Sequence, residues 1–290
     1  MAERPQRRTP RATSATVART ERLTPHMVRV VLAVDPAAAL EIGACTDHYV
    51  KLLFPPGGGS LAQAYGAPYV EPLDVEAIRR DHPREQWPRT RTYTVRAWDE
   101  ASREMSVDFV VHGDEGIAGP WAARVRPGEE IWFMGPGGGY APDAAADWHL
   151  LAGDESALPA VAAAVERLPA GAHARVFLEV GGPAEEQKLH TEGDAEIVWL
   201  HRGDRPVGEA LVEAVSGLEF PPGDVQVFVH GEAHFVKELR RLLRVDRAVP
   251  RERLSVSGYW RRGADEDGWQ SSKREWNARI EAEQESGPEA

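Results

Sequence analysis

RTYTVRAWD, residues 91–99, alternates charged or polar side chains with apolar ones, which is the pattern of a half-exposed β-strand. Similar strand-like stretches fill the first half of the chain: TVARTERLTPHMVRVVLAV (16–34), HYVKLLF (48–54), EMSVDFVVHG (104–113) and EEIWFMGP (129–136). Short strands joined by turns, without a long helix, predict an antiparallel barrel or sandwich. Between them, PPGGGSLAQAYG (55–66) is predicted to be a loop, and LDVEAIRR (73–80) a short helix in an irregular segment.

Beyond residue 143 the pattern changes to continuous apolar strands. These are WHLLAGD (148–154), ARVFLEV (174–180), EIVWLHR (196–202), VQVFVHG (225–231) and RLSVSGYW (253–260), with helices predicted after the first and the fourth. Buried-type strands joined by helices predict a parallel sheet covered by helices. We therefore expect a flexible tail at 1–14, a barrel domain at 15–142, an α/β domain at 143–262 and an acidic C-terminal helix or tail at 263–290. Trp269, Trp276 and Ile280 would share one face of that helix.

Charge and composition narrow the function classes. The 290-residue chain carries 34 basic and 46 acidic residues, a net charge of −12, which argues against nucleic acid or an anionic membrane as the main partner. The single cysteine excludes an intrachain disulfide, a Cys-rich zinc site and a Cys-ligated iron–sulfur cluster. The basic N-terminus lacks the apolar core of a secretory signal, and no apolar run reaches membrane-spanning length. We expect a cytoplasmic, soluble, monomeric protein without membrane insertion.

No motif for a hydrolase or a metalloenzyme is found, which favours chemistry carried by a cofactor. Two strand-to-helix junctions are candidate ligand sites: Asp154, Glu155 and Ser156 after the first strand of the α/β domain, and Gly231 and Glu232 after the fourth. Ligands bind at the carboxyl ends of parallel strands, although helix capping is the commoner explanation for either junction taken alone. A Gly-x-Gly-x-x-Gly fingerprint is absent after the first strand, which weakens a typical Rossmann interpretation.

In the barrel domain, a Gly-rich turn in HGDEGIAGPWAARV (112–125) precedes a predicted short helix at 120–125. Its backbone N–H groups could bind a pyrophosphate.

Taken in order, these motifs resemble a known family. Arg91-x-Tyr93-Thr94, DFVVHG, GIAGPWA and the following α/β pattern are similar to the ferredoxin-reductase-like superfamily. In detail, HYVKLLFP, LLAGDESALPAV, VHGEA and SVSGYWRRG resemble the siderophore-interacting protein family, over residues 15 to 263. The resemblance implies a six-stranded antiparallel FAD-binding barrel followed by an NAD(P)H-binding-like α/β domain with a parallel sheet. It also implies the activity of that family, which is reduction of ferric siderophores.

The resemblance assigns FAD-binding roles in the barrel domain. Tyr93 would stack on the isoalloxazine, Arg91 would bind the pyrophosphate and Thr94 would bond near the reactive flavin nitrogen. The strand lining FAD would supply Asp108, Phe109, Val110 and His112, and the pyrophosphate turn would supply Ala118, Gly119 and Trp121. The family usually has Ser where this chain has Gly119, and the following Pro120 offers no N–H, so this turn departs from the pattern.

In the α/β domain the resemblance assigns cofactor binding to both junctions and to the residues that follow two strands: Asp154, Glu155, Ser156, His201, Arg202, Gly231, Glu232, Tyr259 and Trp260. By its charge, Arg202 would bind a 2′-phosphate and favour NADPH over NADH, unless it is a solvated loop residue. Lys51 and Arg261 are candidates for a basic rim that attracts an anionic ferric siderophore.

The predicted reaction is hydride transfer from NAD(P)H to FAD and then single-electron transfer to ferric siderophore, with release of Fe(II). No catalytic acid or base is required, and ferredoxin is a possible alternative donor. Two alternatives stay open: a general flavin reductase or electron-transfer partner, and a siderophore-binding protein with a degenerate flavin site. Strand alternation raises a further question, because Arg91 and Tyr93 share one face and Thr92 and Thr94 the other. Tyr93 and Thr94 could then meet one ligand only at the strand's end or through the backbone.

Overall fold

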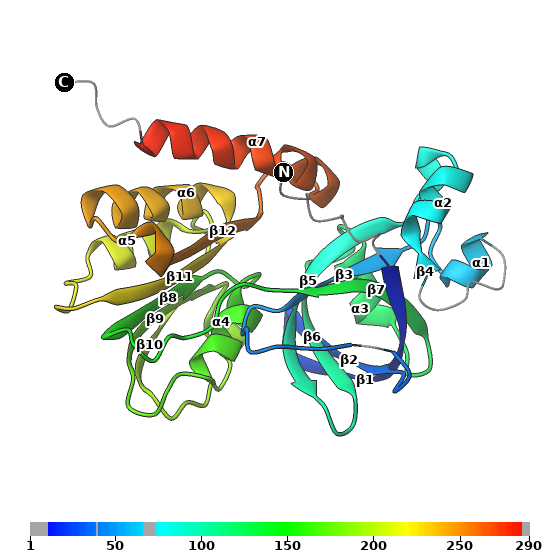
Figure 1. The fold of residues 1–290 in the computed structure, drawn as a ribbon, viewed down its shortest axis with the longest axis horizontal. Coiled ribbons are helices and arrows are strands. Elements are labelled where there is room, and N and C mark those ends of the chain that lie inside the picture. Colours follow the sequence, from blue (N-terminus) through cyan, green and yellow to red (C-terminus); the bar gives the residue numbers. More distant parts are fainter. Residues whose placement is uncertain (1–10, 39, 66–72, 286–290) are drawn as a thin grey trace, which may run out of the picture.

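The computed structural model describes residues 11–38, 40–65 and 73–285, which form a β-barrel beside an α/β domain (Figure 1). The barrel strands are β1 (Arg11–Thr24), β2 (Met27–Val34), β3 (Tyr49–Phe54), β5 (Arg89–Asp99), β6 (Glu104–Val110) and β7 (Glu130–Gly137). They pair in the order β2-β6-β5-β3-β7-β1, and β1 pairs back to β2, so the six antiparallel strands close. This confirms the predicted barrel. Alternating side chains such as Val30, Leu52 and Val107 fill its interior.

Short elements decorate the barrel: α1 (Leu61–Tyr65), β4 (Leu73–Asp74), α2 (Val75–Asp81), a 3-10 turn (Arg84–Gln86) and α3 (Ala118–Arg124). The helix α1 lies in the segment predicted to be a loop, of which residue 66 is outside the described residues. The predicted helix at 73–80 is α2, which Asp74 caps by accepting from the N–H groups of Glu76 and Ala77. The helix predicted at 120–125 begins two residues earlier.

The strand β1 starts inside the segment expected to be a tail. Arg11 and Ala12 pair with β4, and Thr13 and Ser14 pair with β7, so these four residues already have backbone partners. The rest of that tail, residues 1–10, lies outside the described residues.

The α/β domain has a five-stranded parallel sheet in the order β10-β9-β8-β11-β12. Its elements are β8 (Trp148–Gly153), α4 (Leu158–Val165), β9 (His173–Val180), β10 (Asp194–His201), α5 (Glu209–Ser216), β11 (Val225–Glu232), α6 (Ala233–Arg241) and β12 (Leu254–Trp260). A π-helical turn (Leu242–Asp246) and two 3-10 turns (Pro183–Glu185, Arg251–Arg253) complete it. The order reverses between β8 and β11, which is the switch point where open α/β sheets bind ligands.

One feature of this domain differs from the prediction. The helix α5 was not predicted, although its buried Leu211 and Val215 lie four residues apart, on one face. Between β9 and β10, where no helix was predicted, the chain forms a 3-10 turn.

A long helix, α7 (Glu266–Glu285), follows the sheet and lies along α6, with its first turn beside the barrel (Figure 1). Trp269 and Ile280, two members of the predicted apolar face, are buried. Lys237 of α6 pairs with Glu283 at 2.8 Å, and the backbone N–H of Thr92 in β5 donates to Glu266 Oε1 at 2.8 Å. The helix therefore contacts both domains. Among the described helices, none has the length and apolarity to span a membrane.

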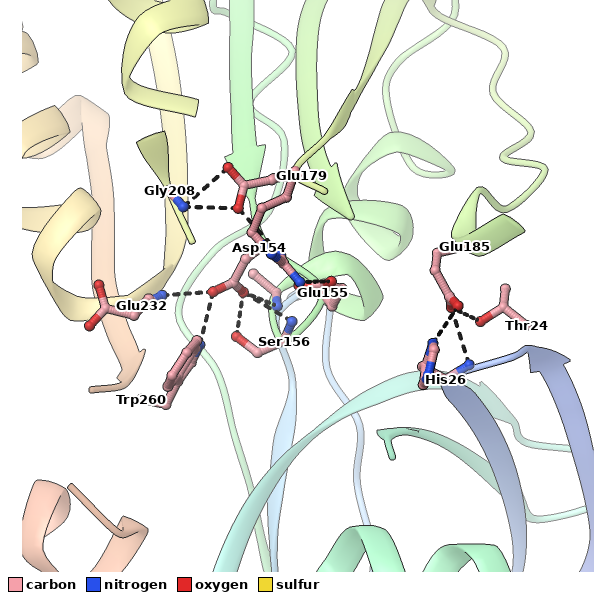
Figure 2. A network of polar contacts seen from close by, with 12 residues as sticks. Thr24, His26, Asp154, Glu155, Ser156, Glu179, Glu185, Gly208, Glu232 and Trp260 are labelled. Atoms are coloured by element: carbon pink, nitrogen blue, oxygen red, sulfur yellow. Dashed lines mark hydrogen bonds and ion pairs between the residues drawn. The ribbon is translucent and has the colours of Figure 1, made fainter. Parts of the chain in front are cut away.

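The two domains also contact each other directly. Arg96 of the barrel forms two contacts of 2.6 and 2.7 Å with Glu166, which follows α4. At a second point Glu185 accepts from Thr24 Oγ1 at 2.5 Å and contacts His26 Nδ1 at 2.7 Å (Figure 2). Apolar side chains of β1–β2 and α4 pack between these contacts, so the domains share a core at their junction.

Candidate functional site

A cleft of about 590 Å³ lies where the barrel, the carboxyl edge of the parallel sheet and α7 meet. Of the residues predicted from the sequence, twelve line it: Lys51, Tyr93, Thr94, Asp108, Val110, His112, Asp154, Glu155, Ser156, Tyr259, Trp260 and Arg261. Eleven other residues that line it were not predicted from the sequence as site residues: Asp47, Tyr49, Thr92, Pro159, His230, Ser257, Ala264, Glu266, Trp269, Gln270 and Lys273. Motif residues from both domains thus meet in one place, as the switch-point rule requires.

The barrel wall of the cleft follows strand register. Tyr49 is paired with Thr94, and Lys51 with Thr92, across β3 and β5. Directly paired residues of antiparallel strands share a face, so these four side chains form one surface towards the cleft. Tyr259 from β12 lies beside Thr94 in the same cleft. The threonines of the RTYT run therefore face the cleft through ordinary alternation.

Tyr93 lies on the opposite strand face and reaches the cleft with only part of its ring. Its ring centroid is 4.3 Å from that of Phe109, which is fully buried, and Phe109 is 5.4 Å from Trp121. Phe109 does not line the cleft itself and supports Tyr93 from behind. This answers the question raised by strand alternation: Tyr93 and Thr94 meet at the cleft from two faces of one strand. The surroundings of Tyr93, burial foremost, raise the pKa of its hydroxyl, so the ring is neutral.

Arg91, predicted to bind a pyrophosphate, does not line the cleft. Its side chain is 10% exposed and bonds Asp267 of α7 at 3.3 Å, with Glu266 at 3.6 Å. One guanidinium N–H also donates to the Thr90 carbonyl at 2.8 Å. In this arrangement the Arg91 guanidinium fixes the start of α7. A phosphate bound there would compete with two carboxylates for the same N–H donors.

Asp108 borders the cleft, but its carboxylate is engaged elsewhere. Both oxygens accept from Arg29 of β2, at 2.7 and 2.8 Å, and this pairing raises the pKa of Arg29 despite burial. Such a bidentate pair fixes the strand and leaves little capacity for a ligand.

The predicted pyrophosphate turn belongs to a different hollow. Trp121 and Pro120 line a hollow of about 790 Å³, together with Phe54 and the glycines 57–59. Neither Ala118, which is buried, nor Gly119 lines the cleft. A Cβ at Gly119 would lie 3.0 Å from the Val110 carbonyl oxygen, so the backbone here approaches β6 too closely for a side chain without adjustment. Glycine at this position therefore fits the local packing.

Asp154 organises the α/β wall (Figure 2). One carboxylate oxygen accepts from Ser156 N–H, Ser156 Oγ and Ala157 N–H at 3.0, 2.5 and 3.2 Å. The other accepts from Glu232 N–H at 2.9 Å and Trp260 Nε1 at 2.8 Å. Burial raises the pKa of Asp154 to about 6, and the hydrogen bonds hold it from rising further, so the group is ionised at neutral pH. Asp154 thereby joins the ends of β8, β11 and β12.

Gly231 and Glu232 support this junction from behind the cleft. Gly231 has φ +140°, and a Cβ there would lie 2.7 Å from Asp154 Cγ, so only glycine fits beside the carboxylate. The carboxylate of Glu232 is fully buried and accepts from the N–H groups of His234 and Arg262 at 2.7 and 3.0 Å. Both residues were predicted to bind cofactor, and the structure places them one layer below the cleft surface.

Arg202 is paired rather than solvated. It forms a bidentate pair with Glu155 at 2.8 and 2.9 Å and contacts Glu179 at 3.4 Å, and the pair with Glu155 raises its pKa. Glu179 is fully buried and also accepts from the Gly208 N–H at 2.8 Å (Figure 2). The neighbouring His201 contacts Glu186 at 2.7 Å. The guanidinium of Arg202, which was predicted to bind a 2′-phosphate, therefore lies between the carboxylates of Glu155 and Glu179.

The fold and the cleft define the class of protein. A closed six-stranded antiparallel barrel followed by a five-stranded parallel α/β sheet is the ferredoxin-reductase-like arrangement. Within that class, residues 16–140 match the siderophore-interacting FAD-binding domain, and residues 146–263 match the siderophore-interacting protein model. The chain belongs to the siderophore-interacting protein family.

Known proteins agree with this assignment. An uncharacterized Mycobacterium tuberculosis protein is 45% identical over 270 residues, covering 89% of this chain and 93% of its own. Ferric vibriobactin reductase ViuB of Vibrio cholerae is 35% identical, covering 65% and 70%, and the NADPH-dependent ferric-chelate reductase of Escherichia coli is 28% identical, covering 84% and 91%. The crystal structure of a siderophore utilization protein from T. fusca superimposes with a TM-score of 0.74 at 38% identity, covering 89% and 95%.

The cleft residues fit an isoalloxazine ring. Tyr93 offers a ring held in place by Phe109, and Thr94 places a hydroxyl on the adjacent surface. The fit is poorer for the pyrophosphate, because Arg91 is bonded to α7. Among the described residues, no cluster of three or more His, Cys, Asp or Glu side chains could hold a metal ion.

Proposed function

We propose that this protein reduces ferric siderophores through FAD, with a reduced nicotinamide dinucleotide as electron donor, and releases Fe(II). The observation that carries the proposal is that one cleft is lined by the Tyr93–Thr94 pair of the barrel and by the Asp154–Ser156 edge of the parallel sheet. A flavin and a dinucleotide bound at those two walls would meet face to face. Two relatives support the activity, one a ferric vibriobactin reductase and the other an NADPH-dependent ferric-chelate reductase.

FAD, when bound, would take two electrons from the dinucleotide as a hydride and pass them singly to two ferric centres. The protein binds and orients the reactants. Tyr93 and Thr94 would hold the flavin ring, with Tyr259 of β12 beside them in the cleft. Asp154 fixes the Trp260 indole by a hydrogen bond of 2.8 Å, so that Trp260 would be available to contact the dinucleotide. No described side chain has to act as an acid or a base.

The proposal also concerns the electron donor and the cellular location of the protein. The Escherichia coli relative favours NADPH, whereas the pairing of Arg202 with Glu155 lowers the local charge available to a 2′-phosphate. Either dinucleotide, or a ferredoxin, would serve the same cleft. We propose a cytoplasmic monomer acting on imported ferric siderophore, with Lys51 and Arg261 at the rim that the substrate meets.

A second candidate is a siderophore-binding protein with a weakened flavin site. The observation that favours it is the engagement of Arg91 by Glu266 and Asp267, together with Pro120, which offers no N–H in the turn predicted to bind the pyrophosphate. Both features remove donors from the predicted phosphate position.

Purification followed by anaerobic titration tests these candidates. The reductase should carry yellow flavin or take up added FAD stoichiometrically. NADH or NADPH should bleach that flavin, and a ferric siderophore should restore its absorbance while a ferrous chelator traps Fe(II). A protein that stays colourless after incubation with FAD refutes the proposed function in favour of the second candidate. Flavin that NAD(P)H bleaches but no ferric complex reoxidises would indicate a general flavin reductase.

A further inference from the structure

The carboxylate of Glu185 bonds across the junction of the two domains. Glu185 lies in the 3-10 turn after β9, and its side chain is only 11% exposed. One carboxylate oxygen accepts from Thr24 Oγ1 at 2.5 Å and from the His26 N–H at 3.2 Å, and the other contacts His26 Nδ1 at 2.7 Å (Figure 2). Among the described residues, every donor to this carboxylate belongs to the barrel. We call Thr24, His26 and Glu185 the clasp.

The clasp makes the contact between the domains directional. A carboxylate that leaves water loses free energy unless donors replace its hydration. Burial alone raises the pKa of Glu185, but the bonds from Thr24 and His26 outweigh burial and lower that pKa, so the group is ionised at neutral pH. Because all of its donors come from one turn of the barrel, the buried charge is satisfied only when the two domains lie at one relative position.

The barrel side of the clasp adjoins the barrel wall of the cleft. The His26 carbonyl accepts from the Val111 N–H at 2.9 Å, and the His26 ring stacks on that of His112 with centroids 6.2 Å apart. Val110 and His112, on either side of Val111, both line the cleft. The turn that holds Glu185 is therefore bonded directly to the strand end that faces a ligand.

The other side of the clasp adjoins the sheet wall of the cleft. The turn of Glu185 begins just after Gly181, where a Cβ would lie 3.8 Å from Glu155 Oε1 and 3.9 Å from Arg202 Nη2. Glu155 lines the cleft. The clasp thus connects the two walls at a point next to both of them.

We infer that Glu185 is a positioning residue, which fixes the spacing between the barrel wall and the sheet wall of the cleft and thereby the rate of hydride transfer. The inference rests on the proposed function, because that function places the flavin at one wall and the dinucleotide at the other. Hydride transfer needs reacting atoms about 3–3.5 Å apart, and a displacement of about 1 Å can slow a reaction about 100-fold. Glu185 is not among the residues that line the cleft, so it would act on the rate and not on affinity.

Other contacts hold the domains together without the clasp. Arg96 and Glu166 pair at 2.6 Å, and apolar side chains of β1–β2 and α4 share a core. Loss of the clasp should therefore alter the alignment of the walls without separating the domains.

The first test compares Glu185→Gln with Glu186→Gln in the flavin-loaded protein. Glu186 is the next residue but contacts His201 of its own domain, so both variants lose one negative charge and only one alters the clasp. Thr24→Val removes a donor of the clasp from the barrel side. Stopped-flow spectroscopy measures flavin reduction at saturating NADH or NADPH and, separately, reoxidation of photoreduced flavin by a ferric trihydroxamate.

Glu185→Gln should slow flavin reduction about tenfold, with the Kd for FAD and the rate of reoxidation changed less than about twofold. Thr24→Val should also slow reduction, and the double variant should be within about twofold of Glu185→Gln because both changes remove the same bond. Glu186→Gln should match the unchanged protein. Equal slowing of both half-reactions, or a lower Tm with both rates unchanged, would overturn the inference.

A distance measurement tests the clasp without turnover. Spin labels on Ala101→Cys of the barrel and Glu219→Cys of the α/β domain, both at exposed positions, report the spacing of the domains by pulsed EPR in a Cys45→Ser background. Glu185→Gln should broaden and shift the distance distribution, and Glu186→Gln should not. An unchanged distribution in Glu185→Gln overturns the inference. If neither dinucleotide reduces the flavin of the unchanged protein, the proposed function fails in its electron donor, and the EPR distances alone decide whether Glu185 sets the spacing.

Discussion

Tyr93 on the barrel and Asp154 on the α/β edge come from the two motifs that resemble the family most closely, and both border one cleft. Their surroundings differ. Tyr93 packs against Phe109 and the barrel core and lines the cleft with its ring. Asp154 is almost fully buried and accepts five hydrogen bonds from three separate strand ends. Tyr93 thus offers a ring surface to a ligand, whereas both carboxylate oxygens of Asp154 are occupied by hydrogen bonds within the protein.

The same division runs through the other motif residues. On the α/β side Gly231, Glu232 and Arg202 are all bonded to or packed against neighbouring loops. On the barrel side Thr92, Thr94 and Lys51 face the cleft, although Arg91 and Asp108 are paired with Asp267 and Arg29. These α/β residues thus shape the edge of the sheet, whereas the barrel side chains that face the cleft are placed to contact a ligand. Substitutions on the two sides should therefore affect different quantities, stability on one side and ligand affinity on the other.

Asp154→Ala should have the largest effect on stability. It leaves the buried Glu232 N–H and the Trp260 indole N–H without their acceptor, whereas the Ala157 N–H keeps its bond to the backbone carbonyl of residue 154. We expect a loss of about 2–4 kcal/mol, because each unsatisfied buried donor costs about 1–3 kcal/mol and removal of a buried charge offsets part of that. Urea denaturation followed by tryptophan fluorescence measures the change.

The matched control is Asp114→Ala, which removes an exposed carboxylate that contacts only Arg124 at the surface. It should change stability by less than about 0.5 kcal/mol. If Asp154→Ala proves as stable as this control while FAD or dinucleotide binding collapses, Asp154 serves the ligand directly and the proposed division of roles is wrong.

The sequence was sufficient for the architecture because its signals are local. Alternation in RTYTVRAWD and continuous apolar runs such as ARVFLEV need only neighbouring residues to be read, and both became strands at the predicted positions. Prediction of the cleft would have required contacts between residues that are far apart in the sequence. Glu266 and Thr92 are brought together by α7 crossing back to the barrel, a contact between residues 174 positions apart in sequence. A helical face that buries Trp269 and Ile280 predicts docking but not the partner surface.

The ion-pair partners of charged residues were likewise not predicted from the sequence. Arg91 and Arg202 looked like phosphate ligands because a sequence shows a charge and not the carboxylate beside it. The structure pairs Arg91 with Asp267 and Arg202 with Glu155. The latter pair was discoverable in principle, because loops after parallel strands meet at one edge and both residues follow such strands.

Tyr93→Ala should affect FAD more than the fold. Base–aromatic stacking contributes about 1–3 kcal/mol, so loss of the ring should raise the Kd for FAD about 10- to 100-fold. Tyr93→Phe keeps the ring and its contact with Phe109 and should bind FAD within about threefold of the unchanged protein. Quenching of flavin fluorescence on titration of the apoprotein gives both values, and circular dichroism confirms that the variants are folded. Unaltered FAD affinity in Tyr93→Ala would contradict the ligand-facing role of the barrel motif.

Glu155→Gln should have the smallest effect. It tests whether Arg202 contacts the dinucleotide or only stabilises the edge of the sheet. The substitution removes the charge that neutralises Arg202 while keeping the shape of the side chain, and Glu179 remains behind it. If a 2′-phosphate reaches Arg202, the ratio of kcat/KM for NADPH to that for NADH should rise about three- to fivefold, which corresponds to about 1 kcal/mol for a charge pair whose side chains are each 15% exposed. Glu186→Gln, which releases only His201, gives the same change of net charge and should leave the ratio unchanged. An unaltered ratio in both variants would mean that Arg202, like Asp154, serves only to hold the sheet edge together, and that the donor's 2′ position lies elsewhere along the cleft.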